Sequence, residues 1–327
     1  MLYRSNILKK LSWSVAIDLE KDFNELSKKW INMMGIKSFS DDKDYIYQYF
    51  NLQKRLVSPT PRYIEKSREF VCPKEYELAL KEIKSKIQKG DNITPYMSDS
   101  ILNINFNDYL LNDWNIHHFH LTRRFREDGF AKRSDYELFI YFTNDTAYFI
   151  QVYPHKKINL YSNKDMIRII YDNWPQLIES NHLKGVRSMT ELLDNQAYSD
   201  LRKANISTMV QIKEDLVFAP FGGGYMCDGS SMDAVLRRNF WIKTIRTQEH
   251  NLVKNIEYIL NLIKIKKESV NKNLEFMLLE FKIDKKFTVL TVLEKNNEII
   301  LELNFQKDEF IIYKFDEFFN LKFLMKR

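Results

Sequence analysis

The sequence predicts an α+β protein with a helical N-terminal region, a central antiparallel sheet with flanking helices, and a C-terminal helix followed by an antiparallel meander. Apolar side chains recur mainly at helical spacing in the first hundred residues, alternate in short runs between 116 and 153, and alternate again between 274 and 315. These changes of period divide the chain into a mainly helical region at 1–111, a central α+β domain at 112–225 and a C-terminal helix-plus-meander module at 226–327.

Three helices are expected in the N-terminal region. Residues 14–34 and residues 45–56 each place apolar side chains at helical spacing. A third helix begins at Pro73 and ends at Gly90. Proline fits the first turn of a helix, and glycine readily adopts the left-handed conformation that closes one.

The central domain begins with strands. Three runs rich in β-branched and aromatic residues predict them, at 116–122, 136–143 and 147–153. Asn144 and Asp145 predict a tight hairpin between the second and third strands. A helix capped by Ser162 or Asn163 follows, and Pro175 bends or ends it.

The remainder of the chain contains two short strands, a long helix and the meander. The short strands are expected at 209–212 and 216–219, and the glycine-rich stretch 222–224 follows them. Ser230 predicts the cap of a helix that runs to about Lys264 or breaks once on the way. Alternating runs then predict four further strands, at 274–283, 287–294, 298–305 and 310–315.

Charge and cysteine content limit the class of protein. A net charge of +6 and a pI near 8.9 permit a phosphate-rich partner without requiring one. Cys72 and Cys227 are the only cysteines and lie far apart, which argues against a disulfide framework or a paired-cysteine zinc site. No apolar run is long enough for a signal peptide or a membrane span, so we expect a soluble, cytoplasmic protein without a membrane partner.

The strongest functional signal is a cluster of histidines on the first central strand. His117, His118 and His120 are three of the six histidines in the chain. Alternate strand residues face the same way, so His118 and His120 share one face and His117 lies opposite. The same rule places Gln151, Tyr153 and His155 together on or just after the third strand. If the polar faces coincide, these residues line one surface with His118 and His120.

This surface favours histidine acid/base catalysis on a phosphodiester. His118 and His120 are the acid/base candidates, with His155 and Tyr153 in support. The basic residues that follow the first strand would bind phosphate: Arg123, Arg124, Arg126 and Lys132, with Arg133 beside them. RNA supplies its own 2'-hydroxyl nucleophile, so such a ribonuclease needs neither metal nor cofactor.

Other interpretations stay open. The histidines can be satisfied strand residues beside a solvated basic loop. A metal can instead be held by three histidines, His118, His120 and His155, with Asp113, although adjacent arginines repel a divalent cation. The stretch Gly222-Gly223-Gly224 can present backbone N–H groups to a phosphate, or can be a flexible turn before a capped helix.

The histidine strand belongs to a longer motif, Asn-Asp-Trp-x-Ile-x-His-x-His-Leu, from Asn112 to Leu121. With His155 and the later Asn173-Trp174-Pro175, it resembles a group of bacterial hypothetical proteins, which implies a bacterial or phage origin but no particular activity. The order of a short helix and three antiparallel strands is also similar in topology to the core of RelE-like mRNA interferase toxins. That similarity implies an action on RNA.

Taken together, these signals predict a toxin-like or phage-defence protein that acts as a metal-independent ribonuclease. RNA is the favoured nucleic-acid partner, and an antitoxin or another defence-system protein is a possible protein partner. The alternative is a non-catalytic component of a bacterial defence system that binds nucleic acid or protein.

Overall fold

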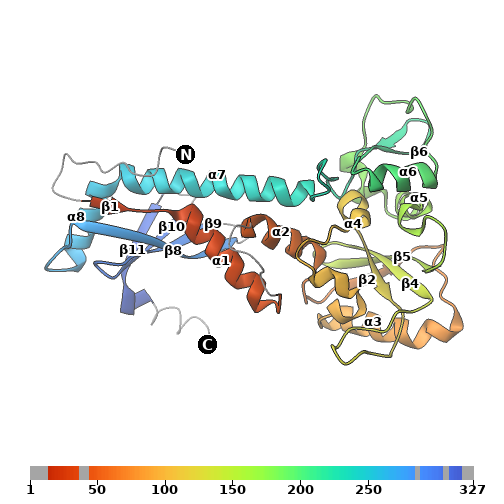
Figure 1. The fold of residues 1–327 in the computed structure, drawn as a ribbon, viewed down its shortest axis with the longest axis horizontal. Helices are drawn as coiled ribbons and strands as arrows, with labels where there is room; N and C mark the ends of the chain where they lie inside the picture. The colour runs from red at the N-terminus through yellow and green to blue at the C-terminus, as the bar shows by residue number, and fades with distance from the viewer. Residues whose placement is uncertain (1–13, 37–43, 284–287, 305–308, 319–327) are drawn as a thin grey trace. The chain divides into compact units, whose positions relative to one another are not determined.

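The computed structural model describes residues 14–36, 44–283, 288–304 and 309–318 and divides into two compact units (Figure 1). The first unit is Met1–Ile46 with Arg238–Arg327, and the second is Tyr47–Arg237. Helices and strands are both abundant and the sheets are mixed or antiparallel, which confirms the α+β class. Among the described residues, no helix has the length and apolar character needed to cross a bilayer. The three-region division predicted above stays a prediction.

The centre of the second unit is a four-stranded sheet in the order β2-β5-β4-β3. The strands are β2 (Tyr63–Lys66), β3 (Ile116–His120), β4 (Tyr136–Phe142) and β5 (Thr146–Pro154). The three predicted strands are confirmed to within two residues and pair antiparallel. The edge strand β2 pairs parallel to β5 and was not predicted. It has only four residues after a proline-rich turn, which is too few to show a strand alternation.

Helices cover both faces of this sheet. On one face α3 (Glu77–Lys89) packs with side chains such as Phe119 and Leu138 in one apolar cluster. On the other face α4 (Tyr109–Trp114) and α5 (Asp165–Asn173) pack with Phe139 in a second cluster. His118 and His120 share the face of Phe139, because strand parity alternates along β3 and His118 pairs with Phe139. The predicted partition of the β3 histidines between two faces is confirmed.

A β-bulge interrupts the ladder between β4 and β5. Phe139 pairs with Gln151, whereas the next residue, Ile140, pairs with Phe149. Ile150 therefore has no partner on β4. An extra residue in one strand inverts the alternation of side chains beyond it.

The bulge makes part of the predicted facing of β5 wrong: Ile150 does not share a face with Val152, whereas Gln151 and Tyr153 do share one, since they pair with Phe139 and Glu137. Simple alternation puts Ile150 with Val152 on one face and Gln151 with Tyr153 on the other. In the structure Ile150 and Tyr153 pack in the same apolar cluster, and Val152 packs in the cluster on the opposite face. The amide of Gln151 hydrogen-bonds the backbone of residues 69–71.

A smaller layer completes the second unit. The helix α6 (Asn195–Lys203), which was not predicted, precedes the antiparallel strands β6 (Val210–Lys213) and β7 (Leu216–Phe218). Short 3-10 turns connect the larger elements, at Lys74–Tyr76, Thr94–Tyr96, Asp99–Leu102, Leu160–Ser162, Pro175–Leu177 and Glu179–Asn181.

The first unit contains a five-stranded sheet in the order β1-β8-β9-β10-β11. These strands are β1 (Ser14–Ala16), β8 (Asn273–Ile283), β9 (Thr288–Glu294), β10 (Ile299–Asn304) and β11 (Glu309–Lys314). The predicted C-terminal meander is confirmed. The helix predicted from residue 14 begins later, as α1 (Leu19–Met33), because β1 pairs in parallel with β8.

Two helices contain the boundary between the units. They are α2 (Tyr45–Arg55) and α7 (Met232–Lys254), and α8 (Ile256–Lys266) follows after a break of one residue. The single break in the long predicted helix is therefore confirmed. Its side-chain cap is Ser231, whose hydroxyl accepts the Ala234 N–H at 3.5 Å, one residue later than predicted.

Candidate functional site

A buried carboxylate lies between two of the predicted histidines. Glu137, which is 1% exposed, places Oε1 3.5 Å from His120 Nδ1 and 3.6 Å from His155 Nε2. The Tyr161 hydroxyl donates a hydrogen bond to Oε2 of the same carboxylate at 2.9 Å. The two imidazole centroids are 6.4 Å apart. We call these three residues the His120–Glu137–His155 group.

The strand register brings the group together. His120 at the end of β3 pairs with Glu137 at the start of β4, and Glu137 pairs in turn with Tyr153 on β5. Paired residues on neighbouring strands hold their Cβ atoms about 5 Å apart, within contact range. His155 directly follows β5, where its backbone N–H donates to Asp135 O at 2.7 Å. Three strands thus meet at one end of the sheet to form the group.

Burial and charge set the protonation of the group. Burial lowers the pKa of His120 and outweighs the opposing charge of Glu137, so His120 is neutral near pH 7 and able to accept a proton. Burial and the Glu137 charge both raise the pKa of Tyr161, which keeps its hydroxyl protonated. The His155 side chain is 39% exposed and can be reached from solvent.

His118 and Tyr153 lie beside the group. The His118 ring is 5.1 Å from the Tyr161 ring and 6.2 Å from the Phe139 ring, centroid to centroid. The Tyr153 ring packs at 5.7 Å against Phe139, and Lys157 Nζ lies 4.3 Å from its centre. Burial raises the pKa of Tyr153 to about 12. These contacts suit His118 and Tyr153 to packing more than to proton transfer.

Two of the predicted phosphate-binding arginines already have carboxylate partners. Arg126 Nη2 lies 2.5 Å from Asp128 Oδ2 and 2.7 Å from Asp99 Oδ2. Arg123 Nε lies 3.3 Å from Glu82 Oε2. An arginine held in this way is less available to an anion than an unpaired one. Phosphate binding by Arg123 and Arg126 stays a prediction, and it would require these ion pairs to open.

The other cations of the loop are exposed. Arg124 and Lys132 face solvent, and within the described parts of the chain neither forms an ion pair; a backbone bond from Lys132 N–H to Arg124 O joins them. Arg133 is close enough for its charge to lower the pKa of both His120 and Tyr161. These three side chains are the cations best placed to meet an anion near the group.

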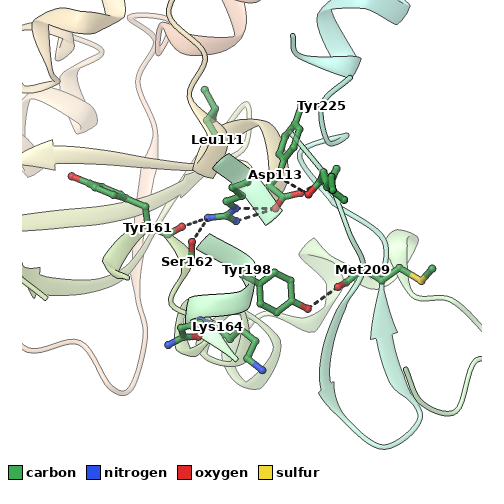
Figure 2. Close-up of polar contacts among 12 residues, drawn as sticks. Leu111, Asp113, Tyr161, Ser162, Lys164, Tyr198, Met209 and Tyr225 are labelled. Atoms are coloured by element: carbon green, nitrogen blue, oxygen red, sulfur yellow. Dashed lines mark hydrogen bonds and ion pairs between the residues drawn. The ribbon is translucent and has the colours of Figure 1, made fainter. Parts of the chain in front are cut away.

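Asp113, which was considered as a metal ligand, instead binds Arg202 and Ser207. Arg202 donates to Asp113 Oδ2 from Nε at 3.1 Å and from Nη2 at 3.0 Å, and Ser207 donates to Oδ1 at 2.9 Å (Figure 2). The same guanidinium lies 4.0 Å from the centre of the Trp114 ring and donates to Tyr161 O. Within the part of the chain that the structure describes, no set of three His, Cys, Asp or Glu side chains is arranged to hold a metal ion.

The glycine-rich stretch packs against α4. Gly222 N–H donates to Asp113 O at 2.9 Å, and Gly224 N–H donates to Asn112 O at 2.8 Å. A Cβ added to Gly222 would lie 2.4 Å from Leu111 O, so only glycine allows this close approach. Since the N–H groups of Gly222 and Gly224 are already bonded, the phosphate-loop interpretation is wrong for them. The stretch forms a turn that leads to the helix capped by Ser231, with Gly223 N–H donating to Pro220 O at 3.0 Å.

Glu137 is the functional residue that the sequence analysis missed. It is the one carboxylate within the apolar run Tyr136–Phe142. That contrast was a usable signal, because a lone charge in a buried strand needs a partner. Its partners, however, depend on the register of β3 against β4 and of β4 against β5.

The group joins residues from three strands around a single buried carboxylate. It provides one neutral buried imidazole, one solvent-accessible imidazole and nearby cations that form no ion pair with the residues the structure describes. No protein-family model, no curated protein and no solved structure matches this chain.

Proposed function

We propose that this chain is a cytoplasmic ribonuclease of a bacterial toxin or phage-defence system, with the His120–Glu137–His155 group as its acid/base site. The observation that supports this proposal is the position of the Glu137 carboxylate within 3.6 Å of both imidazoles. A carboxylate this close to an imidazole nitrogen stabilises the ring when it is protonated. Two rings that share such a carboxylate can act as an acid/base pair.

The proposed reaction uses the 2'-hydroxyl of the RNA itself as the nucleophile. Neutral His120 accepts the proton of the 2'-hydroxyl as that oxygen attacks the adjacent phosphorus. Protonated His155 donates to the departing 5'-oxygen, which leaves a 2',3'-cyclic phosphate and a free 5'-hydroxyl. Arg124, Lys132 and Arg133 offset the charge that develops on the phosphorane. No group other than these side chains and the RNA itself is needed to balance the step.

The experiment compares Glu137→Gln and His155→Gln with the unchanged protein on an end-labelled RNA. We expect each variant to cleave at least about a hundredfold more slowly, the usual scale for loss of acid/base catalysis. His250→Gln is the matched control, because His250 is an exposed histidine on α7 in the other unit. A strand with 2'-deoxyribose at the cleavage position is expected to remain intact, because it lacks the nucleophile.

The second candidate function is RNA binding without cleavage. It is favoured by the exposed cations Arg124 and Lys132, which can bind phosphate whatever the histidines do. This alternative predicts that Arg124→Ala weakens RNA binding, whereas Glu137→Gln and His155→Gln change neither binding nor the length of the RNA. That result would exclude the ribonuclease proposal.

A further inference from the structure

A groove in the second unit runs between the edge strand β2 and the helix α3, which lie side by side (Figure 1). It has a volume of about 590 Å³. Three of its lining side chains are lysines and three are apolar or weakly polar: Lys66, Lys81, Lys84, Phe70, Cys72 and Leu80. Phe119 and Leu138 pack on this same face of the sheet, opposite the face of His118 and His120.

The outer edge of β2 is open to a further strand. In its parallel pairing with β5, Tyr63 N–H donates to Asp145 O, and Ser67 N–H, just after the strand, donates to Phe149 O. Alternation along a parallel strand therefore directs the backbone groups of Ile64 and Lys66 away from β5. No other strand of the described chain pairs with that edge. Strand edges of this kind accept extended peptides.

The positive charge of the groove favours a bound segment with acidic side chains. Burial and the nearby charge of Lys84 lower the pKa of Lys66, so these lysines are close enough to repel one another. Glu77 is the single acidic side chain among the lining residues. A negatively charged occupant would relieve this repulsion.

The lining distinguishes a peptide from a nucleic acid. Single-stranded nucleic acids need aromatic faces on which bases can stack. The one aromatic ring of the groove, Phe70, has Lys66 Nζ 4.8 Å from its centre and packs at 6.0 Å against Phe149. The groove therefore provides strand-edge amides and an apolar floor, but only one partly covered ring in place of the several stacking faces that successive bases need.

We propose that the groove between β2 and α3 binds an extended acidic segment of a partner protein, which adds as a strand to the outer edge of β2. Its acidic side chains contact Lys66, Lys81 and Lys84, and its apolar side chains lie on Phe70 and Leu80. The 13 residues of α3 extend over about 20 Å. An extended chain of about six residues has the same length.

The test uses a fluorescent hexapeptide of alternating glutamate and valine and the full chain. Lys81→Glu combined with Lys84→Glu is expected to weaken peptide binding by about tenfold or more. Lys86→Glu with Lys89→Glu is the matched control, because both lysines are on α3 but outside the groove, and it should change binding by less than about twofold. Equal unfolding temperatures of the two double variants show that folding is not the cause.

Two further measurements separate strand addition from simple charge attraction. N-methylation of alternate peptide nitrogens removes strand hydrogen bonds without changing charge, and it should abolish binding. In a Cys227→Ser background, the peptide should also slow alkylation of Cys72, which lines the groove.

The proposal is overturned if the peptide does not bind, if both double variants weaken it equally, or if the N-methylated peptide binds as well as the parent. Protection of Cys72 by a single-stranded oligouridine but not by the peptide would instead assign the groove to nucleic acid. None of these outcomes depends on whether the His120–Glu137–His155 group cleaves RNA.

Discussion

Two buried carboxylates of the second unit, Asp113 and Glu137, have opposite surroundings. Asp113 receives hydrogen bonds from Arg202 and Ser207, and Arg202 is itself buried and cannot lose its charge. Glu137 lies between two imidazoles, and the side chain of one of them, His155, is 39% exposed. A buried carboxylate with permanent, buried partners supports the fold, whereas one with titratable, accessible partners can support chemistry.

The largest effect on stability is expected at the Asp113 site. Arg202→Ala leaves Asp113 buried without its cation and should lower the free energy of unfolding by about 3–5 kcal/mol. Urea unfolding of both proteins measures this difference. Adding Asp113→Asn to Arg202→Ala should restore part of the loss, since the uncompensated charge is then gone. A loss below about 1 kcal/mol would show that Arg202 does not stabilise the fold through this pair.

Glu137→Gln should have the opposite effect to Arg202→Ala, with a large loss of activity and a small loss of stability. Activity on RNA is expected to fall at least about a hundredfold, because the imidazoles lose the charge that stabilises their protonated form. The free energy of unfolding should change less than in Arg202→Ala, since the glutamine can still accept the Tyr161 hydrogen bond. If the variant unfolds as easily as Arg202→Ala, Glu137 is a structural residue like Asp113.

Gly222→Ala tests how tightly the glycine stretch packs against α4. The added Cβ would lie 2.4 Å from Leu111 O, so a backbone must shift, at a cost of about 1–3 kcal/mol in the free energy of unfolding. Gly129→Ala is the comparison within the loop after β3. It has a positive φ but no atom within 4 Å of an added Cβ, and it should report backbone strain alone.

His117, on the opposite face of β3, should make stability depend on pH. Burial lowers its pKa from 6.5 to about 4 in the folded protein. Between these values the unfolded chain binds a proton that the folded chain does not, so stability falls as pH falls through this window and levels off below about pH 4. The total loss is on the order of 3 kcal/mol. His117→Leu should flatten the unfolding free energy over this pH range, whereas an unchanged slope would assign it to other groups.

The smallest effects are expected among the loop cations. Arg124→Ala or Lys132→Ala should lower the slope of RNA affinity against salt by about one unit, the value for one lost phosphate contact. Arg126→Ala should lower it less, because Arg126 is held by Asp99 and Asp128. Titration of a labelled RNA at several salt concentrations tests this order, and a larger effect of Arg126 would show that its ion pairs open on binding.

Much of the local structure could be predicted from the sequence. The three central strands, the helix that closes at Gly90 and the C-terminal meander follow from the spacing of apolar side chains and from turn residues. The sequence also pointed to His118 and His120, with His155 in support, because strand parity separates these two histidines from His117. The pairing of His120 with His155 through Glu137 came from the structure. Short elements such as β2 and α6 carry too few residues for a clear pattern.

The pairing of these elements could not be predicted from the local pattern of the sequence. A bulge turned Ile150 to the face of Phe139, and the strand register placed Glu137 against His120. The carboxylates near Arg123 and Arg126 include Glu82 and Asp99, which belong to elements much earlier in the chain. Long-range contacts of this kind depend on the packing of whole elements.

Local sequence pattern is enough to predict the α+β class, most helices and strands, and the histidines that face one side of β3. The packing of whole elements brings Glu137 to His120 and His155, pairs Asp113 with Arg202, and leaves the outer edge of β2 open beside α3. The physical reason is the range of the forces involved. Helix and strand periodicity arises between near neighbours in the chain, whereas a buried charge is satisfied by whichever groups the completed sheet brings within a few ångströms.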